Sequence, residues 1–191
     1  RMTFPKEPST KDHSGIVCSD VMGPITPASV SGNKFVVTFI DMKTKYVKVY
    51  PMKTKDEVAE KFDRYRSHVD TETKLKIKTL RSDNGGEYKN KTMTKICQQL
   101  KIKQEFPIPH NPEQNGMAER MNRTLTEMVR CMLQDSRMAK KYWAEAIVAA
   151  SEIRNAVGSS QYSKITPYKL ATGREYYYEA MRVFGSTGYA H

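Results

Sequence analysis

The sequence predicts a layered α/β domain in which helices cover a single mixed sheet. Two observations favour this class. Three strand-like segments come first, and a helix, a strand, a helix, a strand and then a run of helices follow. Strands are recognised by β-branched and aromatic runs, and helices by apolar residues at helical spacing. The 191 residues fit one large domain, or one and a half small ones, with a core that needs neither disulfides nor a structural metal.

The clearest strand signal is the run F-V-V-T-F-I at residues 35–40, which is β-branched or aromatic throughout. Such runs are typical of a buried central strand. A turn at residues 41–45 leads directly into the next strand, so the sheet is expected to begin antiparallel. In chain order, strands are expected at residues 16–22, 35–40, 46–50, 77–82 and 103–106, and a terminal strand begins at 182–185.

Helices are expected where apolar residues recur every three or four positions. In chain order, such segments are residues 55–70, 91–101, 117–134 and 140–157, with Trp143 in the core. A further short helix is expected after Thr166, because threonine is a favourable N-cap and Pro167 suits the first helical position. Gly173 ends it, and residues 107–116, with three prolines, are expected to form a mobile loop.

The charge balance points to a polyanionic partner. The chain has 32 Lys and Arg residues against 21 Asp and Glu residues, a formal net charge of +11. A soluble basic surface is the plainer interpretation, and nucleic acid is the functional one. Apolar runs of membrane-spanning length and a signal peptide are not seen, so no membrane partner is expected. Cys18, Cys97 and Cys131 are far apart without a C-x-x-C motif, so a zinc knuckle is not expected.

Three acidic residues stand in separate motifs: Asp20 in V-C-S-D-V-M-G-P, Asp83 in T-L-R-S-D-N-G-G-E-Y and Glu119 in P-E-Q-N-G-M-A-E-R-M-N-R-T. Taken singly, they fit a strand-end aspartate, a turn cap and a solvated helix face. Taken together, three carboxylates brought close would repel one another, and divalent cations would remove that penalty. Hard oxygen ligands select Mg²⁺ or Mn²⁺, and a pair of such ions can cut or join phosphodiester bonds.

Glu119 lies on the predicted helix at 117–134. At 100° per residue, the core face is a stripe of Met117, Met121, Leu125, Met128 and Met132. Glu119, Arg123, Thr126 and Arg130 fall on the opposite side, and Arg120 and Asn122 border it. This side is expected to present a catalytic carboxylate and arginines to DNA phosphates.

The same stretches carry a resemblance to a known family. S-D-V-M-G-P, G-N-K-F-V-V-T-F-I-D, K-I-K-T-L-R-S-D-N-G-G-E-Y, P-H-N-P-E-Q-N-G-M-A-E-R-M-N-R-T, Y-W-A-E-A, T-P-Y-K-L-A-T-G-R and R-V-F-G cover about residues 15–190. They resemble the catalytic core of integrases from copia-type (Pseudoviridae) LTR retrotransposons and, more distantly, retroviral integrases and other DDE transposases. The resemblance implies an RNase H-like fold, with a five-stranded mixed sheet flanked by helices.

The resemblance also implies a site and a reaction. Asp20, Asp83 and Glu119 would form the catalytic and metal-binding triad for two Mg²⁺ (or Mn²⁺) ions. The chain would join element cDNA ends to host DNA as part of a Gag-Pol polyprotein, as an integrase with transferase and endonuclease chemistry. Gln114 and Asn115 would contact DNA from the active-site loop, and Gly116 would be its hinge.

Domain organisation and partners follow from the same resemblance. Residues 1–14 would be a linker from a missing N-terminal zinc-binding domain, 15–175 the catalytic core, and 176–191 a C-terminal extension. The expected partners are double-stranded DNA and further copies of the chain, without a small-molecule substrate. The expected locations are the nucleus and cytoplasmic virus-like particles.

Three other classes of function are weighed against this one. A catalytically inactive or host-adopted DNA-binding module of the same fold would share the basic charge but not the need for an intact triad. A ribonuclease of similar fold would cleave RNA–DNA hybrids, yet the Q-N-G-M-A-E-R block favours an integrase. A purely structural assembly protein has support only from expected oligomerisation through the late helices.

Overall fold

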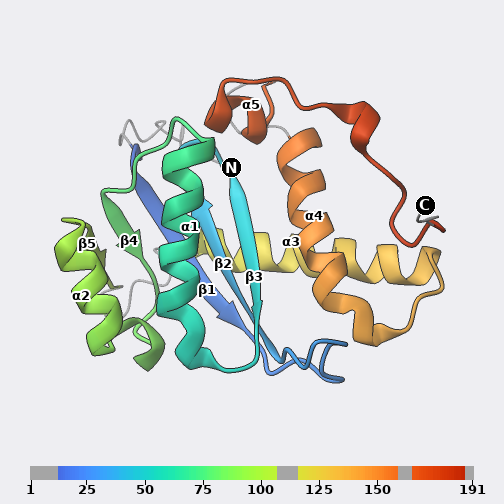
Figure 1. Ribbon diagram of the computed structural model, residues 1–191, viewed down its shortest axis with the longest axis horizontal. Coiled ribbons are helices and arrows are strands. Elements are labelled where there is room, and N and C mark those ends of the chain that lie inside the picture. The colour runs from blue at the N-terminus through green and yellow to red at the C-terminus, as the bar shows by residue number, and fades with distance from the viewer. Residues whose placement is uncertain (1–12, 107–115, 159–164, 188–191) are drawn as a thin grey trace, which may run out of the picture.

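A five-stranded mixed sheet forms the centre of the computed structural model, which describes residues 13–106, 116–158 and 165–187 (Figure 1). The strands are β1 (Ile16–Met22), β2 (Phe35–Asp41), β3 (Val47–Met52), β4 (Thr79–Arg81) and β5 (Lys103–Glu105), in the order β3-β2-β1-β4-β5. β2 pairs antiparallel with β1 and β3, whereas β4 pairs parallel with β1 and β5. The predicted mixed sheet with an antiparallel start is therefore confirmed.

The helices also follow the predicted order. They are α1 (Val58–Glu72), α2 (Lys91–Gln99), α3 (Gly116–Asp135), α4 (Trp143–Val157) and α5 (Pro167–Thr172), with short 3-10 turns at Lys55–Glu57, Gly86–Tyr88, Lys140–Tyr142 and Tyr178–Ala180. The Thr166 side chain caps α5, and Gly173 ends it with a φ of +77°, a left-handed conformation that favours glycine. No helix of the described part is long and apolar enough to cross a membrane.

The terminal strand predicted to begin at residues 182–185 does not form within the described residues, which end at 187. These residues have no strand partner, and Val183 is 73% exposed. Phe184 alone of this segment packs against a core. A strand needs a neighbouring strand for its backbone hydrogen bonds, and this segment follows α4 and α5 away from both edges of the sheet (Figure 1). The β-branched and aromatic pair was therefore insufficient to predict a strand.

The sheet separates two apolar cores. α1 and α2 pack on one face, and α3 and α4 pack on the other, where α3 passes behind the strands (Figure 1). Because side chains alternate along a strand, Val17 of β1 joins the α1 side whereas Cys18 joins the α3 side. Trp143 is 5% exposed in the second core, as predicted. Any β1 residue at an even position near Cys18 therefore faces α3.

The edge strand β3 is partly closed by a side chain of α4. Asn155 Nδ2 donates to the Val47 carbonyl oxygen at 2.7 Å, and the Val47 N–H donates to Asn155 Oδ1 at 2.9 Å. Both residues are buried. The amide side chain thus pairs with the strand as another backbone would, at an edge that is otherwise open to pairing with other chains.

Replacing Asn155 by alanine is expected to lower the free energy of unfolding by about 1–3 kcal/mol, because it leaves the buried N–H and C=O of Val47 without partners. Urea unfolding followed by circular dichroism measures the change. Glu152→Ala, an exposed position on the same helix, is the control and should change stability by no more than ~0.5 kcal/mol. Equal stability of the two variants would contradict the role given to Asn155.

Candidate active site

Asp20 is carried by β1, one of the inner strands of the sheet. It lies between Cys18 and Met22, which both pack toward α3, so the Asp20 side chain points to the same face. Across the antiparallel pair, its partner on β2 is Thr38. The residue is only partly exposed, so part of its carboxylate's hydration must be replaced by protein groups.

Asn122 of α3 replaces some of that hydration. Its Nδ2 donates to Asp20 Oδ2 at 2.8 Å, and its Oδ1 accepts from Thr38 Oγ1 at 2.7 Å. Thr38 is fully buried. The three side chains form one chain of hydrogen bonds that ties α3 to the pair β1–β2.

The position of Asn122 corrects the sequence-based expectation that it contacts DNA. The side chain is 5% exposed, and both ends of its amide are engaged inside the protein. The buried face of α3 comprises Ala118, Met121, Asn122, Leu125 and Val129, rotated from the predicted methionine stripe toward smaller residues. The burial of Asn122 was not predicted, because a helical wheel determines only roughly which direction around the helix axis the buried face points.

Asp83 follows β4 by two residues, at the carboxyl end of a strand parallel to β1. Its Oδ1 accepts a hydrogen bond of 3.1 Å from the Gly85 N–H, so it also caps the turn. A Cβ at Gly85 would lie 3.0 Å from Asp83 Oδ1 and 2.7 Å from the Glu87 carboxyl group, which leaves no room for a side chain. Glu87 is itself paired with Lys55 at 3.3 Å. The turn therefore holds Asp83 in place beside the end of the strand.

Glu119 lies in the first turn of α3 and is exposed. Arg120, Arg123 and Arg130 are also exposed on this helix, as predicted for its polar side. Gly116 starts the helix, and a Cβ there would lie 3.1 Å from Arg120 Nη1. Gln114 and Asn115, the other two residues expected to contact DNA, lie outside the described residues.

The electrostatics of Asp20 show that the three acidic residues share one region. Burial is the largest influence and raises the pKa of Asp20 above its ordinary value. Hydrogen bonds from the Val21 N–H and from Asn122 oppose the shift, whereas repulsion from Asp83 and from Glu119 adds to it. Residues 20, 83 and 119 are far apart in the sequence, so the fold has placed like charges where they destabilise one another.

The donor chemistry of this region fits a hard divalent cation, since carboxylate oxygens are the ligands that Mg²⁺ and Mn²⁺ prefer. The described geometry does not close a complete set of ligands. Among the described residues, no three His, Cys, Asp or Glu side chains lie close enough together to hold a metal ion. Asp20 thus interacts electrostatically with both other carboxylates without forming a three-ligand site in this arrangement.

The contribution of Asn122 was missed in the sequence. The available signal was its place three residues after Glu119, next to the buried Met121. Its partners Asp20 and Thr38 are 102 and 84 residues away, so no local pattern identifies them. Asn122 is a positioning residue for the Asp20 carboxylate.

Removal of the Asp20 charge is expected to stabilise the metal-free protein. Folding raises the pKa of Asp20. The contribution of Asp20 to the stability of the fold is therefore most favourable below the ordinary pKa of aspartate, and it is lost as the pH rises through the raised pKa. Asp20→Asn should therefore raise the Tm at about pH 7 and give a smaller gain at about pH 4. Differential scanning fluorimetry in EDTA measures both. Asp56→Asn removes an exposed carboxylate and should give no gain; a lower Tm for Asp20→Asn at neutral pH would contradict this account.

Comparison with known proteins places this geometry in a family. The family described as Integrase core domain matches residues 12–112, more than half of the chain. The chain is 41% identical over 176 residues to the retrovirus-related Pol polyprotein from transposon TNT 1-94 of Nicotiana tabacum, which covers 92% of this chain and 13% of that protein. It is 32% identical over 161 residues to the Pol polyprotein from transposon RE2 of Arabidopsis thaliana, or 84% of this chain and 11% of that protein. The chain thus spans a small part of the curated relatives that it matches.

Solved structures support the fold. The HTLV-2 integrase catalytic core domain in complex with magnesium, in a trimeric form, superposes with a TM-score of 0.64 at 19% identity, covering 82% of this chain and 95% of that chain. A chain of the simian T-cell lymphotropic virus intasome in complex with PP2A regulatory subunit B56 gamma gives a TM-score of 0.67 at 19% identity, covering 82% and 54%. Retroviral integrase cores have the RNase H-like fold, so the predicted fold is confirmed. The family model matches more than half of the chain, and the identity to a plant copia-type Pol polyprotein is 41%. The sheet order and the grouping of Asp20, Asp83 and Glu119 at one end of the sheet, called the acidic edge here, agree with this match. This chain therefore belongs to the Integrase core domain family.

Proposed function

We propose that this chain is the catalytic core of a retrotransposon integrase, which joins the 3′ ends of element cDNA to host DNA by metal-dependent transesterification. One observation carries the proposal: Asp20, Asp83 and Glu119 come from three separate motifs, and the fold places them in one region. Burial chiefly raises the pKa of Asp20, and repulsion from Asp83 and Glu119 adds to the shift. Divalent cations bound in this region would offset the repulsion.

Asp20, Asp83 and Glu119 would hold two Mg²⁺ or Mn²⁺ ions, which would supply Lewis-acid chemistry for phosphodiester transfer. Asn122 would keep one Asp20 oxygen in place, and its hydrogen bond to Thr38 fixes the orientation of its amide. The Asp83 carboxylate would be oriented by the Gly85 N–H.

The cysteines of the chain do not offer a protein nucleophile for this reaction. Burial raises the pKa of Cys18 and of Cys97 to about 11, so both are thiols at neutral pH. Cys131 is exposed, but it lies twelve residues after Glu119 on α3, roughly 18 Å along the helix axis. Direct displacement by an oxygen of water or DNA is consistent with these positions.

Double-stranded DNA is the proposed substrate. The exposed side of α3 places Arg120, Arg123 and Arg130 along the same helix as Glu119, where guanidinium groups could bind phosphates. The net charge of +11 supports a polyanionic partner. Assembly with further copies of the chain, in the nucleus and in cytoplasmic virus-like particles, belongs to the same proposal.

The chemistry can be tested by disintegration, the reverse of strand transfer, on a branched DNA substrate with Mg²⁺ or Mn²⁺. The native chain is expected to release the joined strand. Asp83→Asn and Glu119→Gln should each reduce the rate at least ~100-fold, because each removes a carboxylate of the triad. The products are resolved on a denaturing gel.

The matched control is Glu127→Gln, which removes an exposed carboxylate from the same helix and should retain the native rate. Metal-dependent joining that survives Asp83→Asn would show that the triad is assigned wrongly. DNA binding without joining, both by this chain and by a longer Pol segment that contains it, would favour the non-catalytic DNA-binding module instead.

Metal binding has a readout that needs no DNA. Mn²⁺ should raise the Tm of the native chain at about pH 7, since a ligand at 100 times its Kd stabilises the folded state by about 2.7 kcal/mol. EDTA should reverse the shift. Asp20→Asn should abolish most of it and Asp56→Asn should not; an equal shift in both variants would place the bound ion elsewhere.

A further inference from the structure

A basic pocket lies at the end of the sheet opposite the acidic residues. It has a volume of about 380 Å³ and is lined by residues before β1, between β2 and β3, before β4 and on α5. The lining includes Gly15, Asp41, Leu75 and Leu170, together with four lysines at positions 43, 74, 76 and 78. Gly15 precedes the start of β1, and Asp20 lies five residues farther along, roughly 17 Å away.

Three of the lysines, called the lysine row here, alternate with apolar residues just before β4. Lys74, Lys76 and Lys78 are exposed, whereas Leu75 and Ile77 between them are half-buried and pack against the α1 side of the sheet. All three lysines also line the pocket. The row therefore places three positive charges at the surface of one short segment.

The backbone beneath the row is anchored at several points. The Lys74 N–H donates to Ala171 O at 2.7 Å, and the Lys78 N–H donates to Gly15 O at 2.8 Å. On the other side, the Lys103 N–H donates to Lys78 O at 2.9 Å. Hydrogen bonds to α5, to β5 and to the residue just before β1 hold the segment in a defined position before any ligand binds, which reduces the entropy lost on binding.

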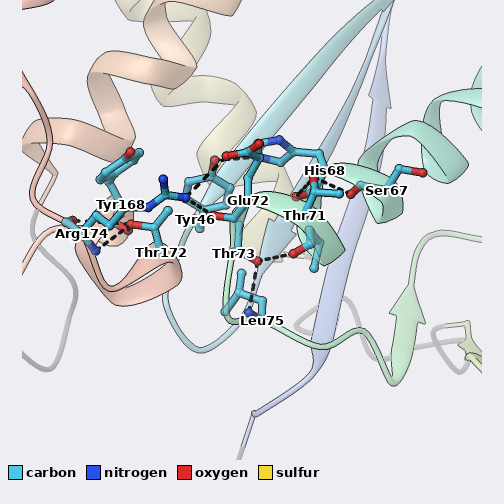
Figure 2. A network of polar contacts seen from close by, with 11 residues as sticks. Tyr46, Ser67, His68, Thr71, Glu72, Thr73, Leu75, Tyr168, Thr172 and Arg174 are labelled. Carbon is cyan, nitrogen blue, oxygen red and sulfur yellow. Dashed lines mark hydrogen bonds and ion pairs between the residues drawn. The ribbon is translucent and has the colours of Figure 1, made fainter.

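The polar network at the end of α1 reinforces the start of the row (Figure 2). Thr73 Oγ1 donates to Val69 O at 2.8 Å and accepts from the Leu75 N–H at 3.1 Å. Arg174, just after α5, reaches back to the Glu72 carbonyl at 3.1 Å and to the Glu72 carboxylate at 3.5 Å (Figure 2). These contacts link α1, the lysine row and α5 into one support.

The acidic groups around the pocket are already engaged. Asp41 is 2% exposed, and its Oδ2 accepts hydrogen bonds from the Thr44 N–H and hydroxyl group at 2.7 and 2.8 Å. Glu72 pairs with Arg174, and Glu175 pairs with Lys169. Among the described residues, no carboxylate forms an ion pair with Lys74, Lys76 or Lys78. The field at the pocket is consequently positive and available to an external anion.

Gly15 allows the row to lie close to the first strand. Its φ is +79°, and a Cβ there would lie 2.9 Å from both the Lys76 carbonyl oxygen and Lys78 Cγ. The Lys78 side chain thus passes directly over the Gly15 backbone, which no other residue type would permit without a shift. Lys74 Nζ approaches Gly173 similarly, so the stems of two lysines of the row rest on glycines.

We propose that Lys74, Lys76 and Lys78 form a second DNA-binding surface that holds the phosphodiester backbone of duplex DNA away from the acidic residues. Three exposed lysines on one anchored segment suit a polyanion with many phosphates better than a single phosphate or carboxylate. Its distance from Asp20 means that it binds other phosphates than those at the acidic edge. Only the choice of DNA as the polyanion rests on the proposed function.

The test is the salt dependence of DNA binding. A triple variant, Lys74→Gln, Lys76→Gln and Lys78→Gln, is compared with the native chain and with a control triple, Lys91→Gln, Lys95→Gln and Lys140→Gln. The control removes the same charge from exposed positions on α2 and at residue 140. Fluorescence anisotropy of a labelled duplex is recorded over a series of salt concentrations in EDTA, so that no metal-dependent turnover contributes.

Loss of three phosphate contacts should reduce the slope of log K against log salt concentration by about 2–3 and weaken binding at low salt at least ~10-fold. The control triple should keep the native slope. The circular dichroism spectrum and the Tm of both variants should match the native chain. Equal slopes for the two triples would overturn the proposal.

Cross-linking tests the location directly. Cys131 is the exposed cysteine of the three, whereas Cys18 and Cys97 are buried. In a Cys131→Ser background, Lys76→Cys should form a disulfide with a duplex that carries a thiol tethered to a backbone phosphate, and Lys95→Cys should not. Equal cross-linking at both positions, or none at residue 76, would reject the surface. Binding and cross-linking through the row without strand joining would uphold this surface while rejecting the proposed catalysis.

Discussion

The placement of a carboxylate on a strand between two apolar cores constrains the rest of the active region. Asp20 cannot be fully hydrated where β1 packs under α3, and burial raises its pKa more than any other influence. Asn122 compensates in part by donating to one oxygen of Asp20, and it is itself oriented by Thr38. Because that hydrogen bond joins α3 to the centre of the sheet, the position of the helix and the position of the carboxylate depend on each other.

The arrangement of the other acidic residues follows from the same packing. The parallel pairing of β4 with β1 brings Asp83 to the strand end on the side where Asp20 lies. The buried face of α3, including Leu125, sets the rotation of that helix and so directs Glu119 outward from its first turn. The repulsion of Asp20 by Asp83 and Glu119 is therefore a product of the hydrophobic packing and not of local sequence.

Opposite charges are separated along the sheet. The acidic residues gather toward the carboxyl ends of β1 and β4, whereas Lys74, Lys76 and Lys78 precede β4 at the other end. The two ends are also held in place differently. A side-chain hydrogen bond from α3 positions Asp20 at the acidic end, whereas backbone hydrogen bonds and close contacts with glycines position the lysines at the other end. Under the two proposals, this polarity keeps the sites for the polyanion and for the cations apart.

Patterns of neighbouring residues were enough to predict the strand order in the chain, the amphipathic helices and the Thr166 cap with Gly173 at its end, since these depend on short-range periodicity and backbone preference. The RNase H-like fold came from the resemblance to copia-type integrases, and the structure confirms it. Contacts between distant segments decided the remainder. Asn122 became a buried partner of Asp20, Asn155 paired with the edge of β3, and the segment at 182–185 found no strand partner. Each outcome depends on which groups meet across more than eighty residues, or fail to meet, and local propensity carries no information about such pairings.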